Sequence, residues 1–176
     1  MIAAKESGAD AFVSVSGPSR GAAMVLRQQL AGKLSETLAK RNEAILTALE
    51  EGQTVANVPP ELNSLYRASV QPYLISWFRY VPEVEIAKLT IPTLILQGDT
   101  DIQVASKDAE ALKRALPDAQ RVIIIGMNHV LKLVPRDQGL QIASYGDPSL
   151  PVAEELSKTL VQFLSKLSNN ATMGRK

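Results

Sequence analysis

The second half of the chain alternates between two hydrophobic patterns. The expected strands at 93–97 and 121–125 contain continuous apolar runs, 94–96 and 122–125, that are typical of strands buried on both faces. Each run is followed by apolar residues at helical spacing, at 106–116 and 152–167. Because strands that alternate with helices pair in parallel, this half predicts an α/β fold whose sheet is covered by helices on both faces.

The first half adds one strand and a long helical segment. Residues 11–16 read as a short buried strand that Gly17-Pro18 stops, and residues 1–7 before it read as the end of a helix. Between 22 and 89 the pattern is helical, with a long helix at 22–51 that Gly32 can bend or split, then short helices at 60–80 and 82–89. We therefore expect about three parallel strands with flanking helices and a helical insertion.

The predicted organisation has three parts. The α/β core takes residues 1–21 and 90–168, the insertion takes 22–89, and the polar residues 169–176 form a disordered tail. An insertion of this length in a compact α/β domain usually has a role, often as a lid over a site. The aromatic residues of 60–80 either line an apolar pocket or pack the insertion, and the sequence leaves both open.

Composition removes several classes of function. The chain has 176 residues, a net charge of +1 and no basic block, so nothing favours nucleic acid. No apolar run approaches the roughly 18 residues of a membrane span. With no cysteine and one histidine, a metal centre is not expected, and no cofactor is predicted. Composition does not fix the compartment; we take the cytoplasm as the default, although an N-terminal signal could have been lost.

Candidate chemistry stands just after the two strands of the second half. Gly98-Asp99-Thr100-Asp101 follows the first, and the lone histidine, His129, follows the second beyond a glycine turn. Since the carboxyl ends of parallel strands meet at one edge of the sheet, we expect an aspartate and His129 to lie together there. Imidazole can take up and return a proton near neutral pH, and a carboxylate can fix its tautomer. The plain alternative is that the aspartates make turn hydrogen bonds and His129 is a loop histidine.

These motifs, with the lead-in 91–98, resemble the C-terminal half of the α/β-hydrolase family, in which the acid follows the seventh strand and the base follows the eighth. The resemblance covers roughly residues 3–168. It implies that Asp101, the fourth position of Gly-x-x-Asp, is the acid, that His129 is the base, and that Asp99 is a loop or capping carboxylate. It also implies a serine nucleophile and a small-molecule ester, thioester or amide substrate, as in esterase- and peptidase-like members.

The nucleophile is the difficult part. Gly17-Pro18-Ser19-Arg20-Gly21 matches the family's G-x-S-x-G and lies between a strand and a helix. However, Pro18 restricts the turn, and residues 1–18 have no room for the earlier strand whose loop completes the oxyanion hole. We therefore expect that Ser19 is not the nucleophile and that the elbow lies upstream of Met1. Ser14 and Ser16 read as residues inside the strand and are poor candidates.

Three functional hypotheses follow. The chain is the C-terminal portion of a serine hydrolase and is inactive alone, or it is a short active hydrolase that uses Ser19, Asp101 and His129. The third is a non-enzymatic remnant that acts as an interaction module. In the first case one edge of the strand at 11–16 is open, and an open edge predicts self-association.

Overall fold

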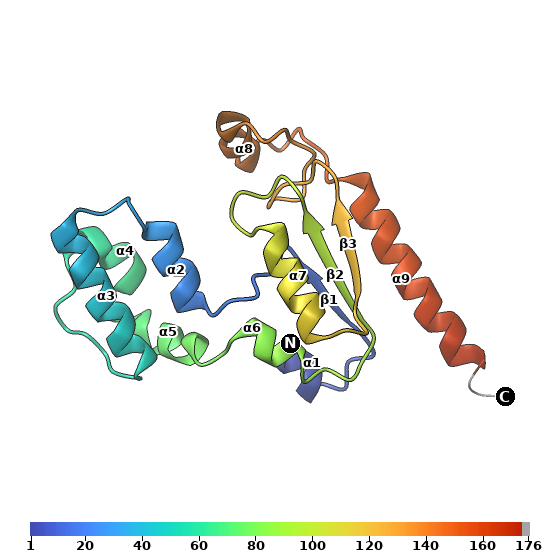
Figure 1. Ribbon diagram of the computed structural model, residues 1–176, viewed down its shortest axis with the longest axis horizontal. Coiled ribbons are helices and arrows are strands. Elements are labelled where there is room, and N and C mark those ends of the chain that lie inside the picture. The colour runs from blue at the N-terminus through green and yellow to red at the C-terminus, as the bar shows by residue number, and fades with distance from the viewer. Residues whose placement is uncertain (174–176) are drawn as a thin grey trace. The chain divides into compact units, whose positions relative to one another are not determined.

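The computed structural model of the chain describes residues 1–173 (Figure 1). It divides into two compact units. The α/β unit combines Met1–Ser19 with the chain from Glu85 onward, and the helical unit is Arg20–Val84. No helix within the described part is long and apolar enough to cross a membrane. The lid role proposed for 22–89 stays a prediction.

A three-stranded parallel sheet forms the centre of the α/β unit. Its strands β1 (Phe12–Val15), β2 (Thr93–Gly98) and β3 (Gln120–Ile124) lie in that order. β2 is the middle strand and all six of its residues are buried, which explains the apolar run 94–96 at its centre. β1 pairs only with β2 among the described residues, so the predicted self-association stays a prediction. The expected α/β fold with three parallel strands is confirmed.

The two faces of the sheet bury separate hydrophobic clusters beneath α7 (Ser106–Ala115) and α9 (Glu154–Met173) (Figure 1). Successive side chains of a strand point to opposite faces, and β2 follows this rule. Leu94 and Leu96 join the α9 cluster, whereas Ile95 joins the α7 cluster. Buried residues of the α9 cluster include Leu96, Ile124, Met127, Leu156 and Phe163. Those of the α7 cluster include Ile95, Ala109, Leu112 and Ala119.

Two short helices complete this unit, α1 (Ile2–Glu6) and α8 (Gln138–Tyr145). A third, α6 (Pro82–Ile86), begins in the helical unit and ends in the α/β unit. The hydrophobic pattern predicted no helix between the strand at 121–125 and the helix at 152–167, but α8 lies there. The Asp137 side chain caps this helix by accepting a hydrogen bond from the Leu140 amide, a local signal that the apolar pattern alone did not carry.

The last helix is longer than expected. The apolar spacing predicted an end near residue 167, but α9 continues to Met173. Helical backbone thus covers the first part of the segment predicted to be disordered, 169–176, and residues 174–176 lie outside the described part.

The helical unit contains five elements. They are α2 (Ala22–Leu30), α3 (Glu36–Glu50), the 3₁₀ helix η1 (Pro60–Leu62), α4 (Asn63–Tyr66) and α5 (Gln71–Phe78). The helical pattern at 22–51, which Gly32 was expected to bend or split, is two helices. Gly32 adopts a left-handed φ of +71°, and Ser35 then starts α3 by accepting a hydrogen bond from the Leu38 amide.

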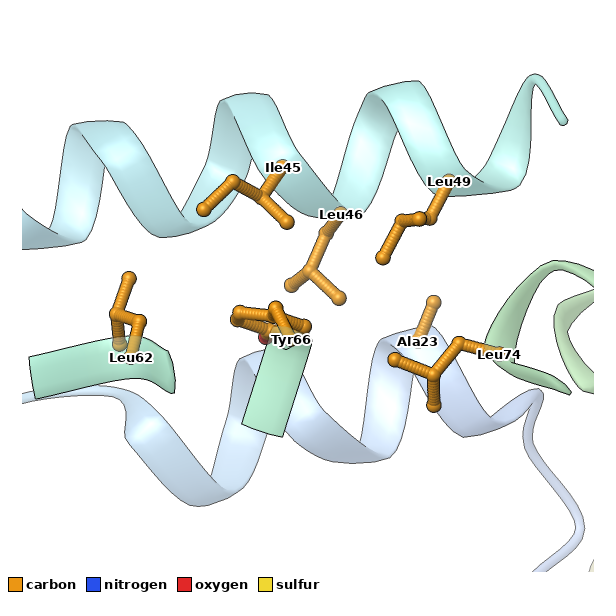
Figure 2. Packing of buried hydrophobic residues seen from close by; sticks show 7 residues of the cluster. All are labelled: Ala23, Ile45, Leu46, Leu49, Leu62, Tyr66 and Leu74. Carbon is orange, nitrogen blue, oxygen red and sulfur yellow. The ribbon is translucent and has the colours of Figure 1, made fainter. Parts of the chain in front are cut away.

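The core of the helical unit lies between α3 and the shorter helices. Figure 2 shows Ile45, Leu46 and Leu49 pointing from α3 toward the side chains of the other elements. Tyr66 is fully buried there and its hydroxyl donates to Asn42 Oδ1 at 2.7 Å. Burial raises the pKa of Tyr66 to about 12, so it stays neutral.

Two of the exposed aromatics of this unit form a pair. The rings of Tyr73 and Trp77 lie 5.6 Å apart, and these residues are 61% and 46% exposed. Tyr80 is exposed as well, whereas Tyr66 lies in the core and the partly buried Phe78 packs against it.

We expect Gly98→Ala to destabilise the α/β unit strongly. A Cβ at Gly98 would lie 1.9 Å from the carbonyl oxygen of Met127, and backbone on both sides would have to move. The expected loss is about 2 kcal/mol or more in the free energy of unfolding, measured by urea denaturation. Gly146→Ala is the matched control, since its Cβ would meet nothing within 4 Å. Equal losses in the two variants would contradict the close approach at Gly98.

Candidate active site

The loops that leave β2 and β3 are hydrogen-bonded to each other. The Thr100 amide donates to Met127 O at 3.2 Å, and the Thr100 hydroxyl donates to Gly126 O at 2.9 Å. Asp99 Oδ1 accepts a bond of 2.6 Å from the Gly126 amide, and the Asp99 carbonyl accepts from the Arg136 guanidinium. The Asp99 side chain and carbonyl thus both accept hydrogen bonds that join the two loops.

The Asp101 side chain is completely buried at the end of β2 and accepts four hydrogen bonds. Oδ1 accepts from the amides of Gln103 and Val104 at 2.8 and 2.9 Å. Oδ2 accepts from Gln97 Nε2 at 3.1 Å and from His129 Nδ1 at 2.9 Å. Four donors around one carboxylate suit its ionised form, which is an acceptor only.

The charge of Asp101 follows from two opposing effects. Burial by itself raises the pKa of the carboxyl group, but the hydrogen bonds from His129 and from the Val104 and Gln103 amides outweigh it. The net result is a pKa below the usual range of an aspartate. Asp101 is therefore ionised at neutral pH.

Gln97 is a polar residue inside the buried middle strand and is only 1% exposed. Its Nε2 donates to Gly98 O and Val104 O, at 3.2 and 2.9 Å, as well as to Asp101. Three oxygens around this atom fix the amide, because the reversed orientation would set oxygen against oxygen. Gln97 Oε1 has no hydrogen-bond partner among the described residues. Gln97 was not among the predicted site residues; its signal was one amide directly after the apolar run 94–96.

His129 is placed by the loop after β3. Since the Asp101 carboxylate can only accept, His129 Nδ1 carries the hydrogen of their bond, and Nε2 of the neutral ring is left as an acceptor. The side chain is 30% exposed, so the ring is accessible. Its neighbour Asn128 is fully buried and ties the loop down, accepting from the Lys132 amide at 3.0 Å and donating to Ser144 Oγ at 2.8 Å.

The structure gives Ser19 a different partner. Its amide and its hydroxyl both donate to Asp108 Oδ1, at 3.1 and 2.9 Å. Ser19 and Asp108 are 3% and 1% exposed, so this contact is buried. The literal G-x-S-x-G match therefore anchors the loop after β1 to the first turn of α7.

An open pocket of about 490 Å³ lies beside His129. Its other lining residues come from the end of β1, from the loop after Asp101 and from the loop after His129: Val15, Ser16, Gly17, Pro18, Gln103, Val104 and Leu131. Ser16, expected inside the strand, lies just after it, because β1 ends at Val15. Among the residues that the structure describes, no group of three or more His, Cys, Asp or Glu side chains could hold a metal ion.

Comparisons with known proteins find similarity in structure only. No family model matches the sequence, and no curated protein is similar to it. A thermophilic esterase from Thermogutta terrifontis is 17% identical with a TM-score of 0.44, and the match covers 93% of this chain and 59% of that one. For an esterase from a Rhodococcus species the values are 21%, 0.35, 82% and 57%.

A bromoperoxidase from Bacillus anthracis is 18% identical with a TM-score of 0.37, and the match covers 85% of this chain and 41% of that one. This chain spans less than two thirds of the length of each of these three structures. Identities this low establish no common activity. These structures are α/β-hydrolases, and the likeness of the chain to them is weak, with TM-scores below 0.5.

Proposed function

We propose that Asp101 and His129 are the acid and base of a serine hydrolase of the α/β-hydrolase type, acting on an ester, thioester or amide bond. The observation that carries the proposal is the 2.9 Å hydrogen bond between a buried, ionised carboxylate and an accessible imidazole. Asp101 holds the ring in the tautomer whose Nε2 can take a proton from a hydroxyl. The same nitrogen then returns the proton to the leaving group.

The nucleophile is proposed to come from a part of the hydrolase that this sequence does not contain. The hydroxyl of Ser19 supports this, since it is buried and bonded to Asp108. A second candidate function, a short hydrolase that uses Ser19, is favoured only by the match at 17–21. It would require Ser19 to leave Asp108 and to reach His129.

Covalent labelling tests the missing nucleophile. A fluorophosphonate probe should leave the chain unlabelled at neutral pH, because the probe needs a serine whose proton a base has taken. Intact mass and peptide mapping read the result. Labelling that disappears in Ser19→Ala would establish the short hydrolase instead.

An activated ester tests the acid–base pair itself. His129 Nε2 should attack the carbonyl of p-nitrophenyl acetate, expel p-nitrophenolate and pass the acetyl group to water. We expect slow p-nitrophenolate release that falls to background in His129→Gln and is unchanged in Ser19→Ala. Release that His129→Gln leaves unchanged would favour the interaction module.

The lowered pKa of Asp101 gives a pH dependence of stability. A carboxylate whose folded pKa is depressed stabilises the fold above its unfolded pKa of about 3.9 and loses this contribution as the pH falls through its folded pKa. We expect Asp101→Asn to be about 2 kcal/mol less stable near pH 7. The gap should shrink below about pH 4. Urea denaturation between about pH 3 and pH 7 measures the difference in free energy of unfolding between the two proteins. A difference that does not depend on pH would contradict an ionised Asp101.

Gln97→Leu should move the pH range in which this stability is lost to higher pH. Without the Gln97 donor the carboxylate accepts one hydrogen bond fewer in its ionised form, which raises the folded pKa of Asp101 toward its ordinary value. Gln141→Leu is the matched control. Gln141 is likewise fully buried, donates to two carbonyls and has an unpartnered Oε1, but its bonds go to Val134 and Pro135. Gln141→Leu should lower the free energy of unfolding without changing the pH range in which the stability from Asp101 is lost. The same shift in both variants would refute the role given to Gln97.

A further inference from the structure

The buried hydroxyl of Ser16 is unpaired within residues 1–173. The residue is 6% exposed, and its Oγ has no hydrogen-bond partner among the described residues. Two other buried serines differ: Ser19 Oγ donates to Asp108 and Ser144 Oγ donates to Gln141 O. Because buried polar groups are nearly always paired, an unpaired one calls for an explanation in strain, function or a bound group.

The backbone of Ser16 is unfavourable as well. Its φ is +48°, in the left-handed region that favours glycine, although Gly17 stands next to it. The Ser16 amide still donates to Leu96 O at 2.9 Å, so the unusual φ falls at the last rung of the β1–β2 ladder. Strained backbone of this kind concentrates at functional sites.

Ser16 and His129 line the same pocket. Most of the remaining walls are apolar, from Val15, Pro18, Val104 and Leu131, and no acidic side chain lines them. The other polar side chain, Gln103, already donates its amide to the Tyr145 hydroxyl at 2.8 Å. No hydrogen bond holds the Ser16 hydroxyl in place, so it can turn about χ1 toward a bound molecule.

We propose that Ser16 is a ligand-binding residue of this pocket. Its hydroxyl donates to the carbonyl-type oxygen of a small molecule whose short apolar chain lies against the pocket walls. His129 stands at the same oxygen-bearing end of that molecule. Its chemical class is a short-chain carboxylate or its ester. Placing this end of the molecule as the reacting end rests on the proposed function, whereas the binding itself does not.

The single histidine makes the test direct, since its ring resonances report on the pocket alone. The chain is titrated with sodium butanoate and, separately, with methyl butanoate, and the His129 ring signals are followed by NMR. A saturable shift with either probe is expected, and a response to butanoate alone identifies a charged acceptor. Ser16→Ala should weaken this binding at least about tenfold, the range of one hydrogen bond to a ligand.

Two further variants separate binding from structure. Ser14→Ala removes a side-chain hydroxyl from a residue of equal exposure, 6%, in the strand just before Ser16 and outside the pocket, and should leave the affinity unchanged. Ser16→Gly removes the unpaired hydroxyl and relieves the left-handed φ, so its melting temperature should equal or exceed the wild-type value while binding is lost.

Wild-type affinity in Ser16→Ala, or no response of His129 to either probe, would overturn the proposal. So would a drop in the melting temperature of Ser16→Gly, which would show a purely structural role. Failure of the proposed function looks different, because it appears as p-nitrophenyl acetate hydrolysis that His129→Gln leaves unchanged. The two results can therefore occur independently.

Discussion

The close approach of the segments that leave β2 and β3 is the constraint on which the site depends. Gly98 makes it possible, since any side chain there would collide with the carbonyl of Met127. Once the two backbones touch, Thr100 and Asp99 bind the opposite loop, and Asp101 and His129 are left within hydrogen-bonding distance. A parallel sheet brings its carboxyl ends to one edge, but only this contact brings two particular side chains together.

The polar groups on the two sides of the His129 ring differ in how completely they are hydrogen-bonded. On the Asp101 side every acceptor position is filled, and the donors come from a strand, a loop and the ring. Such an arrangement restricts the ring to one tautomer and one orientation. On the pocket side the ring is partly exposed and Ser16 keeps an unpaired hydroxyl. The Asp101 side is thus preorganised, whereas on the pocket side the Ser16 hydroxyl is available to a bound molecule.

The sequence was informative where a feature is local or periodic. The apolar runs 94–96 and 122–125 predicted the two strands after which the site residues lie. A strand whose two faces are both covered lacks the alternation of polar and apolar residues that an exposed face produces. The glycine and aspartate after β2 and the lone histidine after β3 then placed Asp101 and His129 at the same edge. The division at Gly32 was left open as a bend or a split, because one glycine lowers helix propensity without fixing where a helix ends.

Other features depend on partners far away in the chain. The hydroxyl of Ser19 finds Asp108, which is 89 residues away, and no motif could reveal that. The letters of G-x-S-x-G therefore pointed to a nucleophile where the structure places an anchored loop. Ser16 was passed over because the apolar pattern extends the strand by one residue beyond its observed end. Gln97 gained its meaning only when the loop after β2 folded back over it.

The protonation of the His129 ring tests the central claim most directly. Nitrogen-15 NMR of the single histidine at neutral pH distinguishes the two neutral tautomers. The hydrogen bond to an ionised Asp101 predicts that Nδ1 carries the hydrogen, and that this preference is lost in Asp101→Ala. A ring that carries its hydrogen on Nε2, or one whose tautomer Asp101→Ala does not change, would contradict the acid–base pair.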